Sequence, residues 1–266
     1  MLIKTSRAEQ TIQEPSMATA PASAMRSLDR AFDVLGVLED TRQPLRLSEV
    51  ARRAELHVAT TQRILNALVE RGYAAREDSG YVAGPAAVAT AHAFLVNNRL
   101  SQVALPVLQE LAATTGQTAS LFVRVAFARL LIARVQGRNP LRYQLPIGEK
   151  LPLTLGAGKA LAAWLSEPEL RTFIDRSTPF TRVSGEQVTA EALADDLRRV
   201  RGDGYALSLS ERVLNVIAIS APIRRGEETL GALSVSGSPN ELTEDDRPRI
   251  IGEVRRAADA IAARCP

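Results

Sequence analysis

The segment Gly156-Ala157-Gly158-Lys159 comes near to a nucleotide-binding loop in its composition. A P-loop also requires glycine at position 153 and serine or threonine at position 160, where the chain has Leu153 and Ala160. The dinucleotide fingerprint fails as well, because Leu161 replaces its last glycine. What remains is a glycine-containing turn into a helix, whose backbone N–H groups can hold a carboxylate or another small anion. A simple tight turn is an equally good interpretation.

Ser234 and Ser236 alternate with Leu233 and Val235, so the two hydroxyls are expected on one face of a strand and the two apolar side chains on the other. Hydroxyls on a sheet face can line a polar cup. They can also be plain solvent-facing residues, which is the favoured interpretation while the fold is unknown. Ser208 shares this ambiguity.

Other residues that could support catalysis are few. Lys159 could form a Schiff base, but a surface or helix-capping role is the favoured interpretation. Cys265 is the only cysteine, which excludes an internal disulfide, and with His57 and His92 it offers too few ligands for a usual Cys/His metal site. Neither histidine has a nucleophile signature beside it. The sequence is therefore weak as an enzyme, and no metal or cofactor is expected.

The segment Leu56-His-Val-Ala-Thr-Thr-Gln-Arg63 places short polar groups and one arginine on the first two turns of a helix. Threonine and N-terminal amides suit phosphate, whereas glutamine and arginine suit adenine and guanine edges. The alternative is a solvated helix face. The arginines expected toward phosphate are Arg46, Arg52, Arg53, Arg63, Arg71 and Arg76.

The surrounding periodicity favours DNA binding. Residues 1–24 have no apolar period and predict a disordered arm. The next elements are predicted as a helix over 27–40 behind a Ser27 cap, a short strand at 45–47, a short helix opened by Ser48, a turn at 55–57, a helix over 58–71 and a β-hairpin over 73–83 around Asp78-Ser79-Gly80. This is the order of a winged helix-turn-helix, with the third helix in the DNA major groove.

The second half predicts an α+β domain. Linker helices are expected over 85–97 and 101–111. Strands are expected over 119–125, 130–135, 141–145, 205–209, 216–223 and 230–236, and helices over 157–165, 167–175, 189–201 and 243–263. The sheet is expected to be mostly antiparallel with helices packed on it.

Length and composition are those of an ordinary globular protein, with 266 residues, 45% hydrophobic and 24% charged. No stretch approaches the roughly 18 uninterrupted apolar residues of a membrane span, and the N-terminus has no signal-peptide segment, so a cytoplasmic protein is expected. Between Arg26 and Gly84 there are nine arginines and nine acidic residues. DNA affinity must therefore come from the placement of charge and from two copies of the domain.

From about Ser27 to its C-terminus the chain resembles IclR-type transcriptional regulators. The resemblance rests on Ser27-Leu-Asp-Arg-Ala31, Leu47-Ser-Glu-Val-Ala-Arg52 through Leu68-Val-Glu-Arg-Gly-Tyr73, Leu105-Pro-Val-Leu108, Leu151-Pro-Leu153 with Gly158-Lys-Ala160, and Gly204-Tyr-Ala206, Glu211-Arg212 and Ala221-Pro222.

The resemblance implies a winged helix for operator DNA, a linker helix and a C-terminal GAF-like domain that binds a small organic or aromatic acid, in a homodimer or homotetramer. Its recognition helix corresponds to 58–70, and the expected DNA-binding residues are Arg46, Ser48, His57, Val58, Ala59, Thr60, Thr61, Gln62, Arg63, Asn66, Arg71 and Arg76. The expected effector-binding residues are Leu141, Leu151, Gly156, Ala157, Ser208, Val216, Ala218, Ser234 and Ser236. Family members usually have glycine where this chain has Glu55, and glycine is common at Asn215.

The sequence thus predicts an α+β regulator without catalytic activity, with an arm over 1–24, a winged helix-turn-helix over 25–84, a linker helix over 85–100 and a GAF-like effector domain over 101–266. The effector carboxylate is expected on the Gly156 and Ala157 amides and the Ser234 and Ser236 hydroxyls. The partners are double-stranded operator DNA, a small organic acid and further copies of the chain, without a membrane. Two alternatives are a metabolite sensor or enzyme whose winged helix is an interaction module, and a regulator whose C-terminal domain is empty and purely structural.

Overall fold

The computed structural model describes residues 22–142 and 145–265. The chain divides into two compact units, with the boundary between Thr90 and Ala91, inside helix α4 (Ala86–Asn97). We call residues 22–90 the N-terminal unit and residues 91–265 the C-terminal unit. The predicted arm lies outside the described residues up to position 21, and its last three residues are helical.

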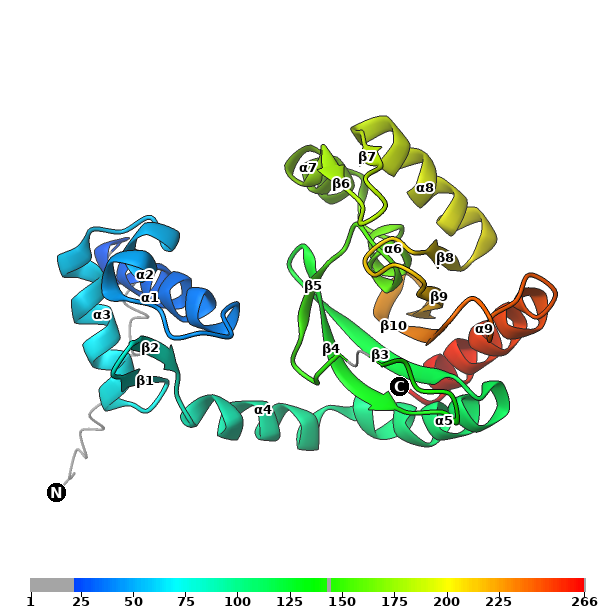
Figure 1. Cartoon of the computed structure of the whole chain (residues 1–266), viewed down its shortest axis with the longest axis horizontal. Helices are drawn as coiled ribbons and strands as arrows, with labels where there is room; N and C mark the ends of the chain where they lie inside the picture. The colour runs from blue at the N-terminus through cyan, green and yellow to red at the C-terminus, as the bar shows by residue number, and fades with distance from the viewer. Residues whose placement is uncertain (1–21, 143–144, 266) are drawn as a thin grey trace, which may run out of the picture. The chain divides into compact units, whose positions relative to one another are not determined.

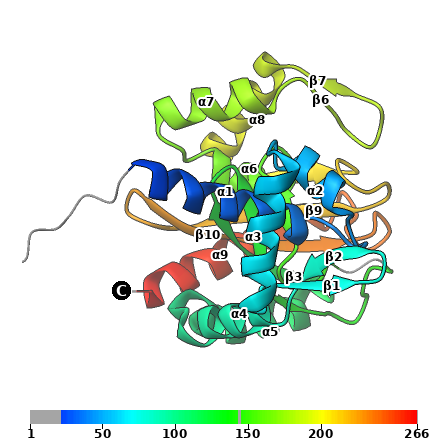
Figure 2. The ribbon, with the colours of Figure 1, turned by 90° about the vertical axis from the view of Figure 1, so that its left-hand side faces the viewer.

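The N-terminal unit packs three helices against a β-hairpin (Figure 2). Its elements are α1 (Ala22–Glu39), α2 (Leu47–Arg53), α3 (Val58–Glu70), β1 (Ala74–Glu77) and β2 (Gly80–Ala83). The core contains Val34 and Leu38 of α1, Val50 of α2 and Leu65 of α3. Helical spacing places these apolar side chains on the inner faces of their helices. The predicted order of helices and hairpin is confirmed.

Three predicted details of this unit are wrong. The strand at 45–47 is a single bridge between Leu45 and Tyr81, because Leu47 already begins α2. Helix α1 begins at Ala22 rather than behind a Ser27 cap, since alanines upstream of Ser27 favour continuing the helix. The hairpin turn is Asp78-Ser79, because Glu77 pairs directly with Gly80.

Helix α5 (Arg99–Thr115) follows α4 and belongs to the C-terminal unit. It begins earlier than the predicted Ser101, because the Asn98 side chain caps it by accepting a hydrogen bond from the Ser101 N–H at 2.8 Å. It ends at Gly116, which adopts φ +72°, a left-handed conformation that glycine reaches without steric cost.

The described part of the C-terminal unit contains a six-stranded antiparallel sheet in the order β5-β4-β3-β10-β9-β8. The strands are β3 (Thr118–Val125), β4 (Ala128–Val135), β5 (Lys150–Pro152), β8 (Ala206–Leu209), β9 (Ile217–Arg225) and β10 (Glu228–Gly237). The α+β class with an antiparallel sheet is confirmed.

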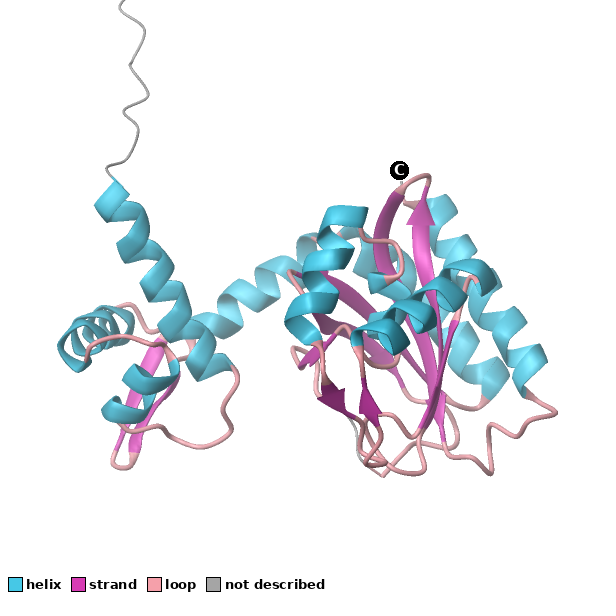
Figure 3. Cartoon of the chain, turned by 90° about the horizontal axis from the view of Figure 1, so that it is seen from above, coloured by secondary structure: helices cyan, strands magenta, loops and turns pink. Residues whose placement is uncertain are grey.

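Helices cover both faces of this sheet (Figures 1 and 3). Helix α5 and α9 (Arg247–Arg264) pack on one face over a core of aliphatic side chains. The other face is covered by α6 (Ala157–Ala162), beside α7 (Glu167–Ser177), α8 (Ala190–Asp203) and the small hairpin of β6 (Phe180–Thr181) and β7 (Gln187–Val188). A second apolar core lies under these helices.

One of the six predicted strands, that over 141–145, is wrong. The described residues of 141–145 form no strand, and Lys150–Pro152 pairs with β4 instead. Pro140 and Pro146 flank the mispredicted segment, and proline cannot donate a hydrogen bond to a ladder. Helix α9 begins at Arg247 rather than Thr243, because Thr243 forms a turn in which its hydroxyl donates to the Asp246 carboxylate at 2.6 Å.

Within residues 22–142 and 145–265, no helix has the length and apolar character that crossing a bilayer requires.

Candidate functional site

The first site is the exposed surface of α3 with its neighbouring turn and hairpin. Most of the predicted DNA-binding side chains are exposed there: Arg46, Ser48, His57, Val58, Ala59, Arg63, Asn66, Arg71 and Arg76, with Thr60 and Gln62 partly exposed. Thr61 is the exception. It is fully buried, and its hydroxyl donates to the His57 carbonyl at 3.2 Å, so its side chain serves the core of the unit.

Helix α3 is tied to the hairpin through Gln62. Its side-chain amide donates to Asn66 Oδ1 at 2.8 Å and to the Tyr81 hydroxyl at 3.1 Å. Gln62 and Asn66 lie one helical turn apart, and Arg63 lies beside them on the outer surface. These contacts hold the polar face of α3 in a defined orientation.

Two of the arginines expected toward phosphate share one carboxylate partner on α2. Arg52 donates to both oxygens of Glu49, at 2.9 and 2.7 Å, and Arg53 donates to Glu49 Oε1 at 2.6 Å. The hydrogen bonds from Arg52 and then Arg53 lower the pKa of Glu49 to about 2. Glu49 therefore partly neutralises the positive charge of Arg52 and Arg53 within α2.

The turn between α2 and α3 contains Glu55 at φ +54°. This is the position where the resembling family usually has glycine, and Asn215, at φ +59°, is a second such position. A left-handed conformation costs a side-chain-bearing residue about 1–2 kcal/mol. The chain adopts this left-handed conformation at both positions with a residue that carries a side chain.

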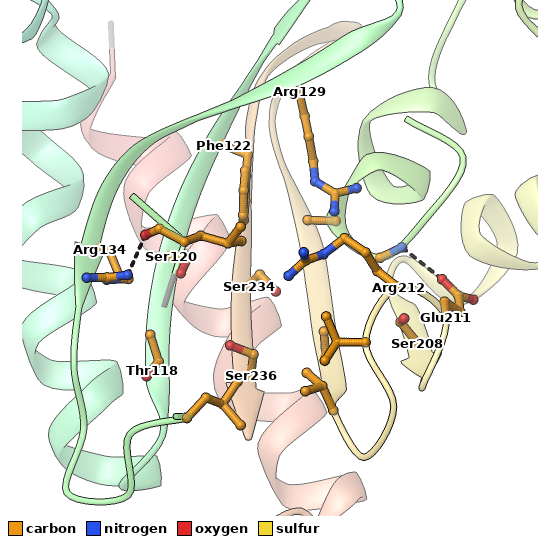
Figure 4. Close-up of a pocket in the computed structure, with 17 residues that line it drawn as sticks. Thr118, Ser120, Phe122, Arg129, Arg134, Ser208, Glu211, Arg212, Ser234 and Ser236 are labelled. Carbon is orange, nitrogen blue, oxygen red and sulfur yellow. Dashed lines mark hydrogen bonds between the residues drawn. The ribbon is translucent and has the colours of Figure 1, made fainter. Parts of the chain in front are cut away.

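The second site is a cavity in the C-terminal unit with a volume of about 90 Å³ (Figure 4). Pockets for drug-sized ligands measure about 300–1,000 Å³, so this cavity suits a compact ligand. It brings together these predicted effector-binding residues: Leu141, Gly156, Ala157, Ser208, Val216, Ala218, Ser234 and Ser236. Leu151 does not line it and packs in the apolar core under α6.

The cavity floor is the hydroxyl-bearing face of the sheet. Ser234 and Ser236 of β10 pair in register with Ser120 and Thr118 of β3, so four hydroxyls lie on two neighbouring strands. The Ser220 hydroxyl donates to Ser234 Oγ at 2.9 Å. Leu233 and Val235 pack into the core on the opposite face, as the alternation predicts, and the polar cup is the arrangement found.

Arg129 is the most buried cation of the cavity, with 4% of its surface exposed. Its Nη1 donates to the carbonyls of Pro152, at 2.9 Å, and Leu155, and its guanidinium lies 5.3 Å from the centre of the Phe122 ring. Burial, and secondly the charge of Arg212, lower the pKa of Arg129 to about 9. Arg129 therefore remains a cation at neutral pH, but its charge is poorly solvated.

A β-bulge brings a second arginine of the same strand to the cavity. Ala133 pairs with Leu121 and Leu131 with Phe122, which leaves Ile132 as the extra residue. Without it, residues 129 and 134 would point to opposite faces, because side chains alternate along a strand. With the bulge, Arg129 and Arg134 both line the cavity.

The Gly156 amide, expected to hold an effector carboxylate, already has an acceptor. Its N–H donates to Glu211 Oε2 at 2.9 Å. Lys159, which does not line the cavity, binds the same side chain: its ammonium donates to Glu211 Oε1 at 2.5 Å and to Asp196 Oδ2 at 3.1 Å. Lys159 is only 2% exposed, so the favoured surface or capping role is wrong.

Sequence reasoning missed these lining residues: Thr118, Ser120, Phe122, Arg129, Arg134, Leu145, Glu211, Arg212 and Val213. The alternation of Thr118, Ser120 and Phe122 with apolar residues matches that of β10 and could have revealed the β3 wall. Glu211-Arg212 belonged to the pattern behind the family resemblance. The two β4 arginines gave no signal, because the bulge breaks the expected alternation.

A helix-turn-helix unit followed by an α+β unit with a polar cavity defines a class of DNA-binding regulators with a second, ligand-sized site. Residues 27–78 match the family model for the IclR helix-turn-helix domain, and residues 92–263 match that for the bacterial transcriptional regulator IclR C-terminal domain. The chain belongs to the IclR family, as the sequence predicted, and is a DNA-binding transcriptional regulator.

Known regulators are similar over most of the chain. Transcriptional repressor IclR of Escherichia coli K12 is 29% identical over 256 residues, covering 94% of this chain and 93% of the relative. The regulator BhcR of Paracoccus denitrificans is 32% identical over 229 residues, covering 84% and 81%.

Two solved structures show the same fold. An IclR-family regulator from Brucella abortus superposes with a TM-score of 0.78 at 22% identity, covering 97% of each chain. An IclR homolog from Microbacterium hydrocarbonoxydans, solved in complex with 4-hydroxybenzoate, gives a TM-score of 0.69 at 22% identity, covering 90% of this chain and 98% of the homolog.

Proposed function

We propose that this regulator senses a small organic acid in the cavity of its C-terminal unit and thereby changes its binding to operator DNA, without catalytic activity. The observation that carries the proposal is Arg129: a nearly fully buried guanidinium at a ligand-sized, hydroxyl-lined cavity. Its Nε has no hydrogen-bond partner within residues 22–142 and 145–265. A carboxylate beside it would form a charge-assisted pair and offset the cost of the buried charge. The homolog solved with 4-hydroxybenzoate supports an acid as ligand.

The acid's carboxylate lies between Arg129 and Arg212, and its remaining atoms lie over Ser234 and Ser236. Arg212 belongs beside Arg129 because its charge acts on the pKa of that guanidinium. This arrangement replaces the Gly156 amide as the anchor, since that N–H is bonded to Glu211.

A catalytic alternative would need a reactive amine, and Lys159 does not supply one. Its ammonium is paired with two carboxylates and does not line the cavity. An amine that is held by two carboxylates outside the cavity cannot reach a ligand bound inside it. The geometry therefore favours a sensor over a Schiff-base enzyme.

DNA binding is assigned to the exposed face of α3. Gln62, Arg63 and Asn66 face base edges in the major groove. Arg46, Arg71 and Arg76 lie toward the phosphates. The protein acts in the cytoplasm, where bacterial operators lie. Because the domain has as many acidic residues as arginines, useful affinity requires at least a homodimer bound to two half-sites.

Replacing Arg63 tests this assignment. Arg63→Ala should weaken binding to DNA from the upstream region of the protein's own gene by about 1–3 kcal/mol, roughly 5- to 150-fold, because it removes a base-edge contact. The measurement is fluorescence anisotropy at fixed salt, with Arg171→Ala, an exposed arginine of α7, as the matched control. Sequence-specific binding that survives Arg63→Ala unchanged would contradict this assignment of α3.

A further inference from the structure

The hydroxyl groups that line the cavity stand in two neighbouring rows across the sheet (Figure 4). In one row, Ser236 of β10 pairs in register with Thr118 of β3, and Ser208 of β8 lies in the same row. In the next row, Ser234 pairs with Ser120. Neighbouring strands lie about 5 Å apart, and alternate residues of one strand about 7 Å apart. A ligand of about three or four carbon atoms on this floor is therefore within reach of several hydroxyls at once.

Most of these hydroxyls have no partner in the protein. Within residues 22–142 and 145–265, no hydrogen bond is formed by the side chains of Thr118, Ser120, Ser208 and Ser236. The first three residues are each only 6% exposed. Their oxygens are nevertheless not sealed in the protein interior, so a ligand in the cavity can reach them. Because buried polar groups are nearly always hydrogen-bonded, these hydroxyls are suited to partners on the ligand.

The floor can both donate and accept hydrogen bonds. Ser234 accepts from the Ser220 hydroxyl at 2.9 Å, which leaves its own proton available to the cavity. Each of the other hydroxyls can donate one hydrogen bond and accept two. Hydroxyl groups on a ligand match such a floor, because they also donate and accept. An apolar surface laid over it would displace water without replacing the hydrogen bonds of that water, which lowers affinity.

The cavity also limits the carbon skeleton of the ligand. Its volume is about 90 Å³. An engineered cavity of about 150 Å³ holds one benzene ring. A ring that carries a carboxylate is therefore large for this cavity, whereas a short aliphatic chain fits it.

From the unpartnered hydroxyls and the small volume we infer that the effector is a short aliphatic hydroxy acid, with hydroxyl groups on the carbons that follow its carboxylate. The carboxylate lies at Arg129, and the hydroxyls of the acid pair with those of the floor. The C–H groups of the acid face the apolar lining residues Leu141, Val213 and Val216. This inference rests on the proposed sensing of a small acid and names the class of acid.

The test compares acids that share a carbon skeleton and differ only in their hydroxyl groups. Propionate, lactate and glycerate form one series, and butyrate, 3-hydroxybutyrate and 2,3-dihydroxybutyrate form a second. Each acid is titrated into the full-length protein by calorimetry at pH 7.5, where the carboxylates are ionised. In at least one series a hydroxy acid should bind about tenfold or more tightly than the unsubstituted acid, because a site that pairs with hydroxyls rejects an analogue that lacks them.

The double variant Thr118→Val/Ser120→Ala tests whether the floor is the source of this preference. It removes both hydroxyls of β3, and valine keeps the branched shape of the threonine. The preference for the hydroxy acid over the unsubstituted acid should fall at least about threefold. Thermal unfolding followed by circular dichroism shows that the variant is folded. Ser184→Ala, an exposed serine outside the cavity, should keep the full preference.

Two other results are distinguishable. If the unsubstituted acids or benzoate bind the wild type as tightly as the hydroxy acids, or if the folded double variant keeps the whole preference, the inference of a hydroxy acid is overturned and the proposed sensing of an acid stands. If none of these acids binds, and 4-hydroxybenzoate does not bind either, both proposals are overturned.

Discussion

Single residues of this chain have roles that their type and neighbours in the sequence did not disclose. Lys159 follows a glycine turn that suggested anion binding, yet its ammonium lies in a buried network with Glu211 and Asp196. Arg129 lies in a strand whose only other charged residue is Arg134, and it is the most buried cation at the cavity. Buried charges need partners brought by tertiary structure, and those partners are distant in the chain.

Removing the ammonium of Lys159 tests the network directly. Lys159→Met should lower the free energy of unfolding by about 3–5 kcal/mol, because Glu211 and Asp196 lose their common buried partner. Urea denaturation measures the change. The exposed Lys150 provides the control, since Lys150→Met should change the stability by no more than about 0.5 kcal/mol. Equal stabilities of the two variants would show that the network contributes nothing.

At the scale of elements, the periodicity of the sequence predicted those helices and strands that are determined by residues close together in the chain. The helices of the N-terminal unit, the hairpin and the two faces of β10 follow from apolar spacing alone. The bulge at Ile132 and the Lys150–Pro152 strand depend on pairing between segments, which a single sequence does not display. The cavity floor on β10 was therefore predictable, whereas the arginine wall on β4 was not.

Helix α4 exposes several apolar side chains to solvent. It is rich in alanine and other apolar residues, yet none of its residues is buried in the described chain; Val88, Phe94 and Val96 are 71%, 42% and 52% exposed. Apolar side chains that gather on one side of a helix are ordinarily covered by other protein. We expect α4 to form part of the interface between two copies.

A charge on α4 should weaken that interface. Phe94→Glu should raise the dimer dissociation constant by at least about tenfold, because a carboxylate would have to lose its water in the interface. Sedimentation velocity measures the dissociation, with His92→Glu, on the opposite side of α4, as the control. A wild-type monomer, or a Phe94→Glu dimer as tight as the wild type, would exclude this role of α4.

At the scale of the whole molecule, a single equilibrium between two arrangements of the oligomer would link ligand binding to DNA binding. An acid can change DNA binding only if its affinity differs between two arrangements of the oligomer, and DNA must then change the affinity for the acid by the same factor. Such couplings usually amount to 1–3 kcal/mol, about 5- to 150-fold. Whether the acid strengthens or weakens DNA binding depends on which arrangement matches the spacing of the half-sites.

The most direct test of this account is the affinity for upstream DNA, measured by anisotropy at fixed salt with and without a saturating concentration of a small organic acid that calorimetry shows to bind the protein. The wild type should change its DNA affinity at least about fivefold on addition of the acid. The double variant Ser234→Ala/Ser236→Ala should bind DNA normally without acid and respond only at higher acid concentration, since both hydroxyls line the cavity. A DNA affinity that no bound acid alters would contradict the account.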